Sequence, residues 1–142
     1  MIIAVRIAGM VDMPGRFSEA LYRLRLGRKY SAVLVKPTEP NLKLLRILRD
    51  HIAYGDIDKE TLIMLLKKRA KMTGKLDKDK KIDAEKIASE LDKKSLSELG
   101  VKPFFRLHPP IGGINTKNHF PIKKGVLGDN KTEINKLVRR ML

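Results

Sequence analysis

Apolar positions recur along the chain with two periods, and each period indicates a different kind of element. Short apolar runs rich in β-branched residues predict strands at 2–7, 30–36 and 51–55. Between these strands, apolar residues three and four positions apart predict helices over 16–27 and 38–48. Gly27 is expected to end the first helix. The first 55 residues therefore predict a compact strand-helix-strand-helix-strand unit, with both helices on one face of a three-stranded sheet.

A mostly helical pattern follows this unit. A helix is predicted at 58–69, and a polar loop at 73–81 separates it from a short helix that begins at Asp83. Ser95 and Glu98 then have the spacing of a capping box, in which each residue satisfies a backbone N–H of the other. This middle part of the chain is expected to dock on the first unit as a helical extension.

The end of the chain combines an irregular segment with one more helix. Residues 104–107 have strand character, and the paired prolines and glycines that follow predict a long excursion over 108–128. Asn130 and Glu133 have N-x-x-E capping spacing, which predicts the start of a final helix. The apolar positions of that helix repeat at helical intervals up to residue 141.

These elements predict an α+β fold class. A small ferredoxin-like β-α-β-α-β unit at 1–56 precedes a mostly helical extension at 57–142 that carries a long basic loop. A chain of 142 residues, 42% hydrophobic, can bury a modest core. It has no cysteine and three scattered histidines, so neither a disulfide nor a metal site is expected, and no cofactor is assigned. No apolar run approaches the roughly 20 residues of a membrane helix, and we expect a cytosolic protein without a membrane partner.

Charge adds the first functional signal. The chain has 31 Lys and Arg against 16 Asp and Glu, a net charge of +15. Residues 1–55 carry +6, residues 56–102 carry +3 and residues 103–142 carry +6. Such a field attracts phosphate backbones and makes association dependent on salt. Nucleic acid is therefore the expected partner, and the two outer parts of the chain are the expected contact surfaces.

The segment from 99 to 128 contains no Asp or Glu. We expect it to build no core of its own and to complete its folding on a counter-charged partner. Its glycines allow backbone N–H groups to approach phosphates, its lysines neutralise them, and His119 with Phe120 can stack on an unpaired base. The alternative is a solvated surface loop. The candidate RNA-binding residues here are Arg106, His108, Gly112, Gly113, Lys117, Asn118, His119, Lys123 and Lys124.

A second basic cluster lies at the end of the first predicted helix. Its guanidinium groups suit bidentate contacts with phosphate, although cations also favour the C-terminal end of a helix without any ligand. The cluster consists of Arg23, Arg25, Arg28 and Lys29. Arg139 and Arg140 of the final helix are expected to face solvent or phosphate and join the candidates. The basic residues at 67–71 can equally bind phosphate or only stabilise the C-terminal end of their helix, and both interpretations stay open.

Enzymatic interpretations have less support. The stretch VRIAGMVDMPGRF loosely resembles the phosphate-gripping loop of acylphosphatases, which would make Arg16 an oxyanion-binding group. The second predicted strand, YSAVLVK, lacks the asparagine that would orient the attacking water. No catalytic residue is therefore assigned, and Arg16 is kept as an RNA-binding candidate. Tyr22 and Tyr54 are expected to be half-buried packing residues. A free-standing RNA- or DNA-binding regulator is one class of protein that would use these basic surfaces.

Four segments carry a resemblance to a known family. They read ALYRLRLGRKYSAVLV at 20–35, AYGDIDKETLIMLLKKRA at 53–70, RLHPPIGG at 106–113 and INKLVRRM at 134–141. With the first strand they cover most of the chain in order, and the last two are specific. The chain resembles universal large-subunit ribosomal protein thirty in its long archaeal and eukaryotic form, which includes eukaryotic large-subunit protein seven.

The resemblance implies a structural component of the large ribosomal subunit in the cytoplasm, with no catalysis and no small-molecule substrate. Its principal partner would be large-subunit rRNA, near the 5S rRNA, with neighbouring ribosomal proteins. The short bacterial form resembles only the first 55 or so residues, so the boundary near residue 56 coincides with the one drawn from composition. By motif, Arg23, Arg25 and Arg28 would lie in a basic helical segment, and 108–113 in an RNA-facing loop that becomes ordered on RNA.

Overall fold

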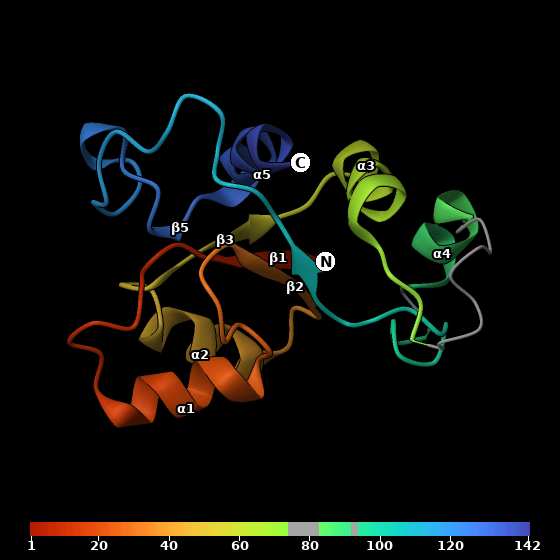
Figure 1. Cartoon of the computed structure of the whole chain (residues 1–142), viewed down its shortest axis with the longest axis horizontal. Helices are drawn as coiled ribbons and strands as arrows, with labels where there is room; N and C mark the ends of the chain where they lie inside the picture. The colour runs from red at the N-terminus through yellow and green to blue at the C-terminus, as the bar shows by residue number, and fades with distance from the viewer. Residues whose placement is uncertain (74–82, 92–93) are drawn as a thin grey trace.

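A five-stranded sheet lies at the centre of the computed structural model, which describes residues 1–73, 83–91 and 94–142. The strands are β1 (Ile2–Arg6), β2 (Ser31–Val35), β3 (Ile52–Asp56), β4 (Phe105–Arg106) and β5 (Gly128–Asp129). Their order across the sheet is β4-β2-β1-β3-β5. All neighbours are antiparallel except β3 and β5, which are parallel (Figure 1). The first three strands confirm the predicted unit.

The central strand β1 is buried on both faces, which explains its continuous apolar run. Ile3 and Val5 belong to one core cluster, whereas Ile2 and Ala4 belong to the other. The helices α1 (Gly15–Arg23) and α2 (Glu39–Ile47) cover the second face together, as the sequence predicted (Figure 1). The strand therefore separates two hydrophobic layers, in keeping with its period of two.

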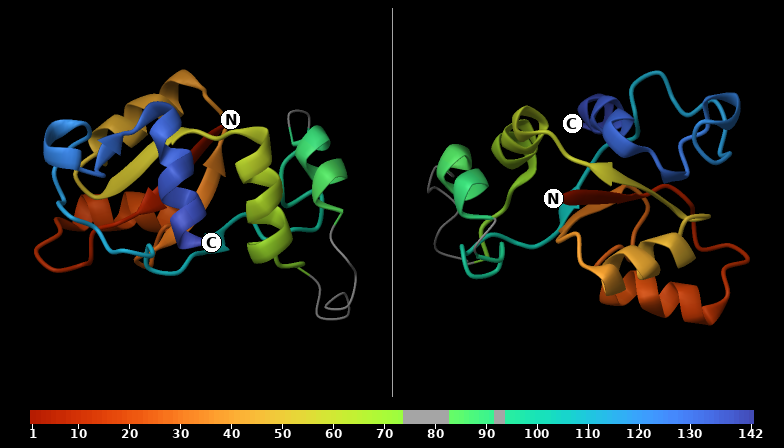
Figure 2. Two further views of the ribbon diagram at one scale, coloured as in Figure 1. Left: turned by 90° about the horizontal axis from the view of Figure 1, so that it is seen from above. Right: turned by 180° about the vertical axis from the view of Figure 1, so that it is seen from behind.

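The opposite face of the sheet is covered by the C-terminal part of the chain. The helices α3 (Lys59–Arg69) and α5 (Ile134–Met141) lie over it, and α4 (Ala84–Glu90) packs against α3 farther from the sheet (Figure 2). Ile134, Val138 and Met141 of α5 are fully buried in this layer. The fold is thus α+β, a ferredoxin-like unit with a helical C-terminal part, as predicted.

The C-terminal part also adds to the sheet, which the sequence did not predict. The expected sheet of three strands has five, because β4 pairs with β2 and β5 pairs with β3. The expectation that 99–128 builds no core is wrong as well. Phe105, Leu107 and Leu127 are buried in the layer under α3 and α5. The division at residue 56 stays a prediction, since the sheet and this layer draw residues from both sides of it.

The start of the last helix differs from the predicted cap. A turn of 3-10 helix, η2 (Lys131–Glu133), precedes α5, so the helix begins at Ile134 and not at Asn130. The buried side chain of Asn130 donates hydrogen bonds to the carbonyls of Val126 (2.7 Å) and Gly128 (3.2 Å) instead of capping a helix. A residue predicted to start a helix therefore fixes the loop before it.

Gly55 lies where η2 crosses β3 most closely. A Cβ atom at this position would collide with the carbonyl oxygen of Lys131 and contact Ile134. Only glycine lets the C-terminal part approach the sheet this closely.

Two further predictions concern the segment between α3 and β4. The capping box is confirmed: the Ser95 N–H donates to the Glu98 carboxylate at 3.0 Å, and the Glu98 N–H donates to Ser95 Oγ at 3.4 Å. It closes a turn and not a regular helix. The polar loop predicted at 73–81 lies, beyond Thr73, outside the described residues. Within the described part of the chain, every helix is too short or too polar to cross a membrane.

Candidate nucleic-acid interface

The first basic cluster is positioned by the way α1 ends. The helix ends at Arg23, and Arg25 adopts a left-handed backbone conformation with φ of 61°. The Leu26 N–H donates to the Leu21 carbonyl at 2.8 Å, and the Leu26 side chain is fully buried. The predicted stop at Gly27 is therefore wrong: the left-handed residue after the helix is Arg25, two positions before the glycine, and the buried leucine sets the turn. The turn leaves Arg25 and Arg28 exposed on either side of Leu26.

This turn forms one wall of a groove against strand β4. The cavity has a volume of about 670 Å³ and is lined by Tyr22, Arg23, Arg25, Gly27, Arg28, Ser31, Phe104 and Arg106. Tyr22 was expected to be half-buried, but 77% of it is exposed. The Arg106 guanidinium carbon lies 5.6 Å from the centre of the Phe104 ring. Four arginines and two aromatic rings thus share one hollow with no acidic side chain in its lining.

The groove continues past β4 towards α3. This second cavity, of about 520 Å³, is lined by Lys68, Arg69, Ala70, Lys71, Lys102, Phe104, Arg106, Leu107 and His108. Phe104 and Arg106 line both cavities, so the two are adjacent, and together they are called here the basic groove. The basic residues at 67–71, for which two interpretations stayed open, contribute three members to this wall.

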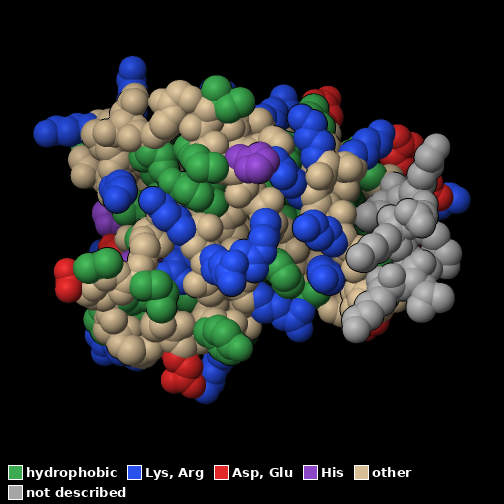
Figure 3. All heavy atoms as spheres, viewed as in Figure 1, with side chains coloured by type: hydrophobic (Ala, Val, Ile, Leu, Met, Phe, Trp, Pro, Cys, Tyr) green, Lys and Arg blue, Asp and Glu red, His purple; other side chains and the backbone are tan. Residues whose placement is uncertain are grey.

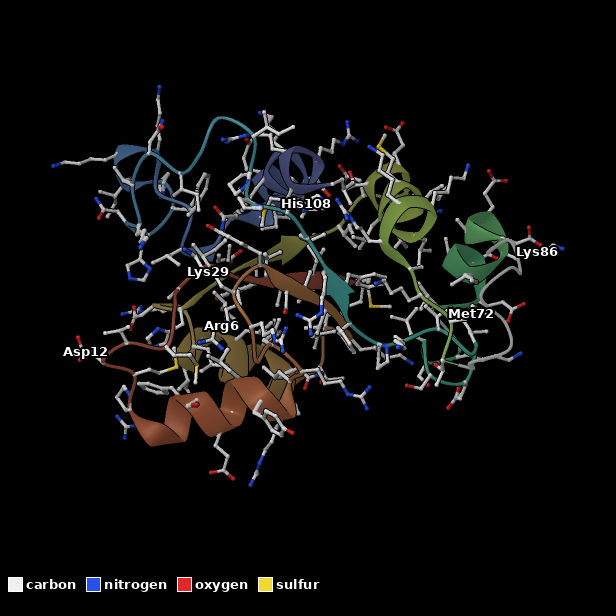
Figure 4. The ribbon with its side chains drawn as sticks, viewed as in Figure 1. Arg6, Asp12, Lys29, Met72, Lys86 and His108 are labelled. Atoms are coloured by element: carbon white, nitrogen blue, oxygen red, sulfur yellow. The ribbon has the colours of Figure 1, made fainter. Side chains whose placement is uncertain are left out.

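The basic groove opens on a face where cations gather. Lys and Arg side chains gather across the centre and right of the face shown in Figure 3, and the acidic side chains lie towards its rim. Figure 4 places Lys29 and His108 on this same face. The Lys29 Nζ lies 4.9 Å from the centre of the Tyr30 ring, which orients this chain at the edge of the groove. A polyanion approaching this face meets a field of one sign.

One member of the groove also serves the fold. Arg69 donates a hydrogen bond of 2.7 Å to the main-chain oxygen of Leu142, while its buried Nε has no partner among the described residues. The guanidinium therefore holds the end of α5 beneath the groove, and its Nε stays without a partner within the described part of the chain.

The loop after β4 is attached to α5 before it leaves the groove. The His108 N–H donates to Met141 O, and the Ile111 N–H donates to Arg140 O. In return, Arg140 donates from Nε to Ile111 O at 2.8 Å and from Nη2 to Gly113 O at 2.5 Å. The turn between them needs left-handed conformations, with φ of 79° at Gly112 and 70° at Gly113. These contacts give 108–113 a defined path.

Arg139 and Arg140 are exposed, as expected, and their guanidinium groups also contact the protein. Arg139 donates to Thr61 Oγ1 at 3.0 Å and to Glu60 of α3 at 3.2 Å. Arg140 holds the loop as described above. Their binding to RNA remains a prediction, and any phosphate contact would compete with these bonds.

Beyond Gly113 the chain forms a lobe of residues 114–127, which lies away from the basic groove (Figure 1). Lys117, Lys123 and Lys124 are exposed on it, and a hydrogen bond of 3.0 Å from Thr116 to the Lys123 carbonyl closes it. The Asn118 carbonyl accepts from the Leu127 N–H at 3.0 Å. The single predicted loop site is therefore divided in two: Arg106 and His108 at the groove, and the three lysines on the lobe.

Arg16 and Arg23 have neighbours of their own. The Arg16 guanidinium carbon lies 4.8 Å from the centre of the Phe17 ring, and this arginine is exposed near the start of α1. Arg23 forms an exposed ion pair of 2.6 Å with Glu19 one turn earlier. Such a pair contributes little and exchanges easily for a phosphate.

Arg6 at the end of β1 organises the loop that follows this strand. The side chain is 1% exposed, and it donates to the carbonyls of Ala8, Gly9, Leu26 and Gly27 at 2.9 to 3.0 Å. Figure 4 shows it between the sheet and α1, with Asp12 in the loop that it supports. Burial lowers the pKa of this guanidinium. Arg6 thereby joins that loop to the turn that forms the groove.

Sequence reasoning missed Tyr22, Phe104, Lys71 and Lys102 as candidate site residues. The basic character of 67–71 was the only available signal, because the meeting of α1, β4 and α3 depends on pairing across the sheet. The described residues contain no group of His, Asp and Glu side chains arranged for a metal ion.

Known proteins resemble this chain over nearly its whole length. The large ribosomal subunit protein uL30 of Archaeoglobus fulgidus is 37% identical over 153 aligned positions, which cover 99% of both chains. The protein of the same name from Thermofilum pendens is 42% identical, with 99% of this chain and 97% of that one covered. The uL30 protein of Aeropyrum pernix is 39% identical, and the alignment covers 97% of this chain and 96% of that one. No family model matches the chain.

Proposed function

Because the chain belongs to the uL30 family of large ribosomal subunit proteins, we propose that it is a structural constituent of that subunit and binds large-subunit rRNA through the basic groove. The family resemblance carried by its sequence motifs is thereby confirmed. The cell compartment is then the cytoplasm, where the ribosome is. The observation that carries the proposed contact is the pair of adjacent cavities of the basic groove, which reach from Arg28 to Lys71 and are lined by cations and aromatic rings and by no acidic side chain.

The chemistry of the groove suits folded RNA. Phosphate contacts from its arginines and lysines supply affinity, and backbone shape supplies most of the selection, since the deep groove of an RNA helix hides its base edges. Exposed Tyr22 and the Phe104 ring offer surfaces for an unstacked base. His108 and the turn at 112–113, which is held by hydrogen bonds from Arg140 to the Ile111 and Gly113 carbonyls, extend this surface. The lysines of the lobe reach a second part of the RNA.

The position within the subunit is a finer part of the proposal. We place the groove against rRNA near the 5S rRNA, with other ribosomal proteins as neighbours. The balanced charge of residues 56–102, compared with the basic ends of the chain, favours α3 and α4 as the side that meets protein.

Catalysis is not part of the proposed function. An acyl-phosphate hydrolase needs an asparagine beside the anion-binding loop, and β2 reads SAVLV. Arg16 lies on the surface against Phe17. We therefore expect no turnover of a small acyl phosphate such as acetyl phosphate by the purified protein. Turnover that the substitution Arg16→Ala abolishes would contradict this expectation.

Sedimentation distinguishes the ribosomal role from that of a free nucleic-acid-binding regulator. A tagged copy is expressed in its own cells, and the lysate is separated on a gradient at moderate salt and then washed at high salt. We expect one copy per large subunit, retained through the wash. A slowly sedimenting pool that is absent from the subunits would reject the ribosomal role and favour the regulator. The control is a tag on an unrelated small basic protein.

A further inference from the structure

A further cavity, separate from the two of the basic groove, lies between the end of α2, the sheet edge at β3 and β5, and the lobe of residues 114–127. Its volume is about 350 Å³, and it is lined by Arg46, Arg49, Tyr54, His119, Phe120, Leu127, Gly128 and Asp129. It shares no lining residue with the basic groove. Of these residues, the sequence pointed to His119 and to Phe120 as its stacking neighbour, and the proposed function uses none of the lining residues.

The wall of this pocket on the lobe side is held in place by the protein. His119 Nε2 lies 2.9 Å from Asp50 Oδ1, just after α2, and the backbone at His119 bridges to Leu127. The Phe120 N–H donates to the Leu127 carbonyl at 2.9 Å. The Asn130 amide holds the far side through Val126 and Gly128. The pocket is therefore formed before any ligand arrives, which lowers the entropic cost of binding.

Tyr54 supplies a neutral polar group to the pocket. The residue lines the pocket and is only 7% exposed. Burial, with a smaller contribution from Asp129, raises the pKa of this phenol, so it remains a neutral donor at physiological pH. A ligand in the pocket can accept a hydrogen bond from this hydroxyl.

The remaining lining residues define the chemistry of that ligand. Arg46 and Arg49 are exposed at one side, and the nearest carboxylate to Arg49, that of Asp50, lies 3.8 Å away. Two guanidinium groups suit a phosphate. The Phe120 ring provides a stacking surface, and Asp129 provides a carboxylate that accepts from an amino group. An acidic peptide would fit poorly, because Asp129 would repel its carboxylates.

We propose that this pocket holds one unstacked nucleotide of the large-subunit rRNA, with its phosphate at Arg46 and Arg49. The base stacks against Phe120, and its amino group donates to Asp129. The Tyr54 hydroxyl bonds an acceptor on the same base. The volume lies at the small end of ligand pockets, which suits a single nucleotide. Uracil has no amino group, so adenine, guanine or cytosine is the expected base. This inference rests on the proposed function, since it requires the rRNA to be the partner.

The test is base-resolved chemical probing of the large-subunit rRNA in complex with the full chain. The variants are Tyr54→Phe, which removes only the hydroxyl, and Arg46→Gln. The matched control is Lys43→Gln, an exposed residue of the same helix that pairs with Glu39 at 2.7 Å outside the pocket. We expect one amino-bearing base to be protected with the unaltered protein and the control, and reactive with both variants. Affinity should fall about three- to tenfold for each.

The possible results separate this inference from the proposed function. If both variants leave every protected base and the affinity unchanged, while cation substitutions in the basic groove still weaken binding, the pocket inference is rejected and the proposed function stands. If the unaltered protein does not bind the rRNA, both are rejected. If the variants change only contacts with another protein of the assembled subunit, the occupant is a protein and the inference is overturned. A urea unfolding curve for each variant checks that the fold is retained.

Discussion

The triple substitution of Arg28, Lys71 and Arg106 by Gln tests the basic groove most directly. All three side chains are exposed, and none has an ion-pair partner among the described residues. Each phosphate contact contributes about 0.7 to 0.9 to the slope of log K against log salt, so losing three lowers the slope by about two to three. At 0.1 M salt the same loss weakens rRNA binding about 100- to 500-fold, or about 3 to 4 kcal/mol.

The assay is filter binding of large-subunit rRNA over a series of salt concentrations. The matched control replaces three exposed lysines that already have carboxylate partners, Lys43, Lys86 and Lys136, by Gln. Both proteins lose three positive charges, so a non-specific effect of net charge would change both slopes alike. Equal slopes for the two proteins would refute the assignment of the groove. Both should retain the free energy of unfolding of the original chain, because all the substitutions are on the surface.

The remaining predictions concern the lobe, the buried arginine and the buried tyrosine. Replacing Lys117, Lys123 and Lys124 by Ala should lower the salt slope by about two to three with little change in stability; an unchanged slope in the same filter assay would show that the lobe does not touch phosphate. Arg6→Lys should lower the free energy of unfolding by about 3 kcal/mol, because several carbonyls lose their donor, and urea denaturation measures this; a loss below about 0.5 kcal/mol would contradict the role of Arg6. The raised pKa of Tyr54 means that the unfolded chain loses this proton first, near its usual pH of about 10, so the free energy of unfolding should fall as the pH rises above that value. Tyr54→Phe should show a shallower fall over the same range in urea titrations, and identical pH profiles would contradict the shift.

The sequence predicted the elements whose signal is local. The three long strands and the helices between them follow from apolar spacing over ten or so residues, and the Ser95–Glu98 capping box from two residues three apart. The edge strands β4 and β5 have two residues each, and β5 contains a glycine. Their pairing depends on segments far apart along the chain, which no local period reveals.

The same limit applies to the candidate site. Basic composition singled out Arg28 and Arg106 in two separate clusters, and only the fold brings both to one cavity. It also assigned Arg140 no contact within the protein, although that arginine holds the loop carbonyls. The sequence shows which residues carry charge. Only the fold decides whether a charged side chain contacts a backbone carbonyl or solvent. Tyr22 was misjudged for the converse reason, since its exposure depends on how α1 ends.

The covering of the sheet by α3 and α5 has a consequence for synthesis of the chain. Ile3 and Val5 emerge early, but the helix that buries them with Ile134 and Val138 is translated last. Until then, a nascent chain can form the hydrophobic layer between the sheet and the helices α1 and α2. The other face of its sheet remains exposed to water and to chaperones. A chain interrupted before α5 therefore exposes a hydrophobic surface by which quality control can recognise it.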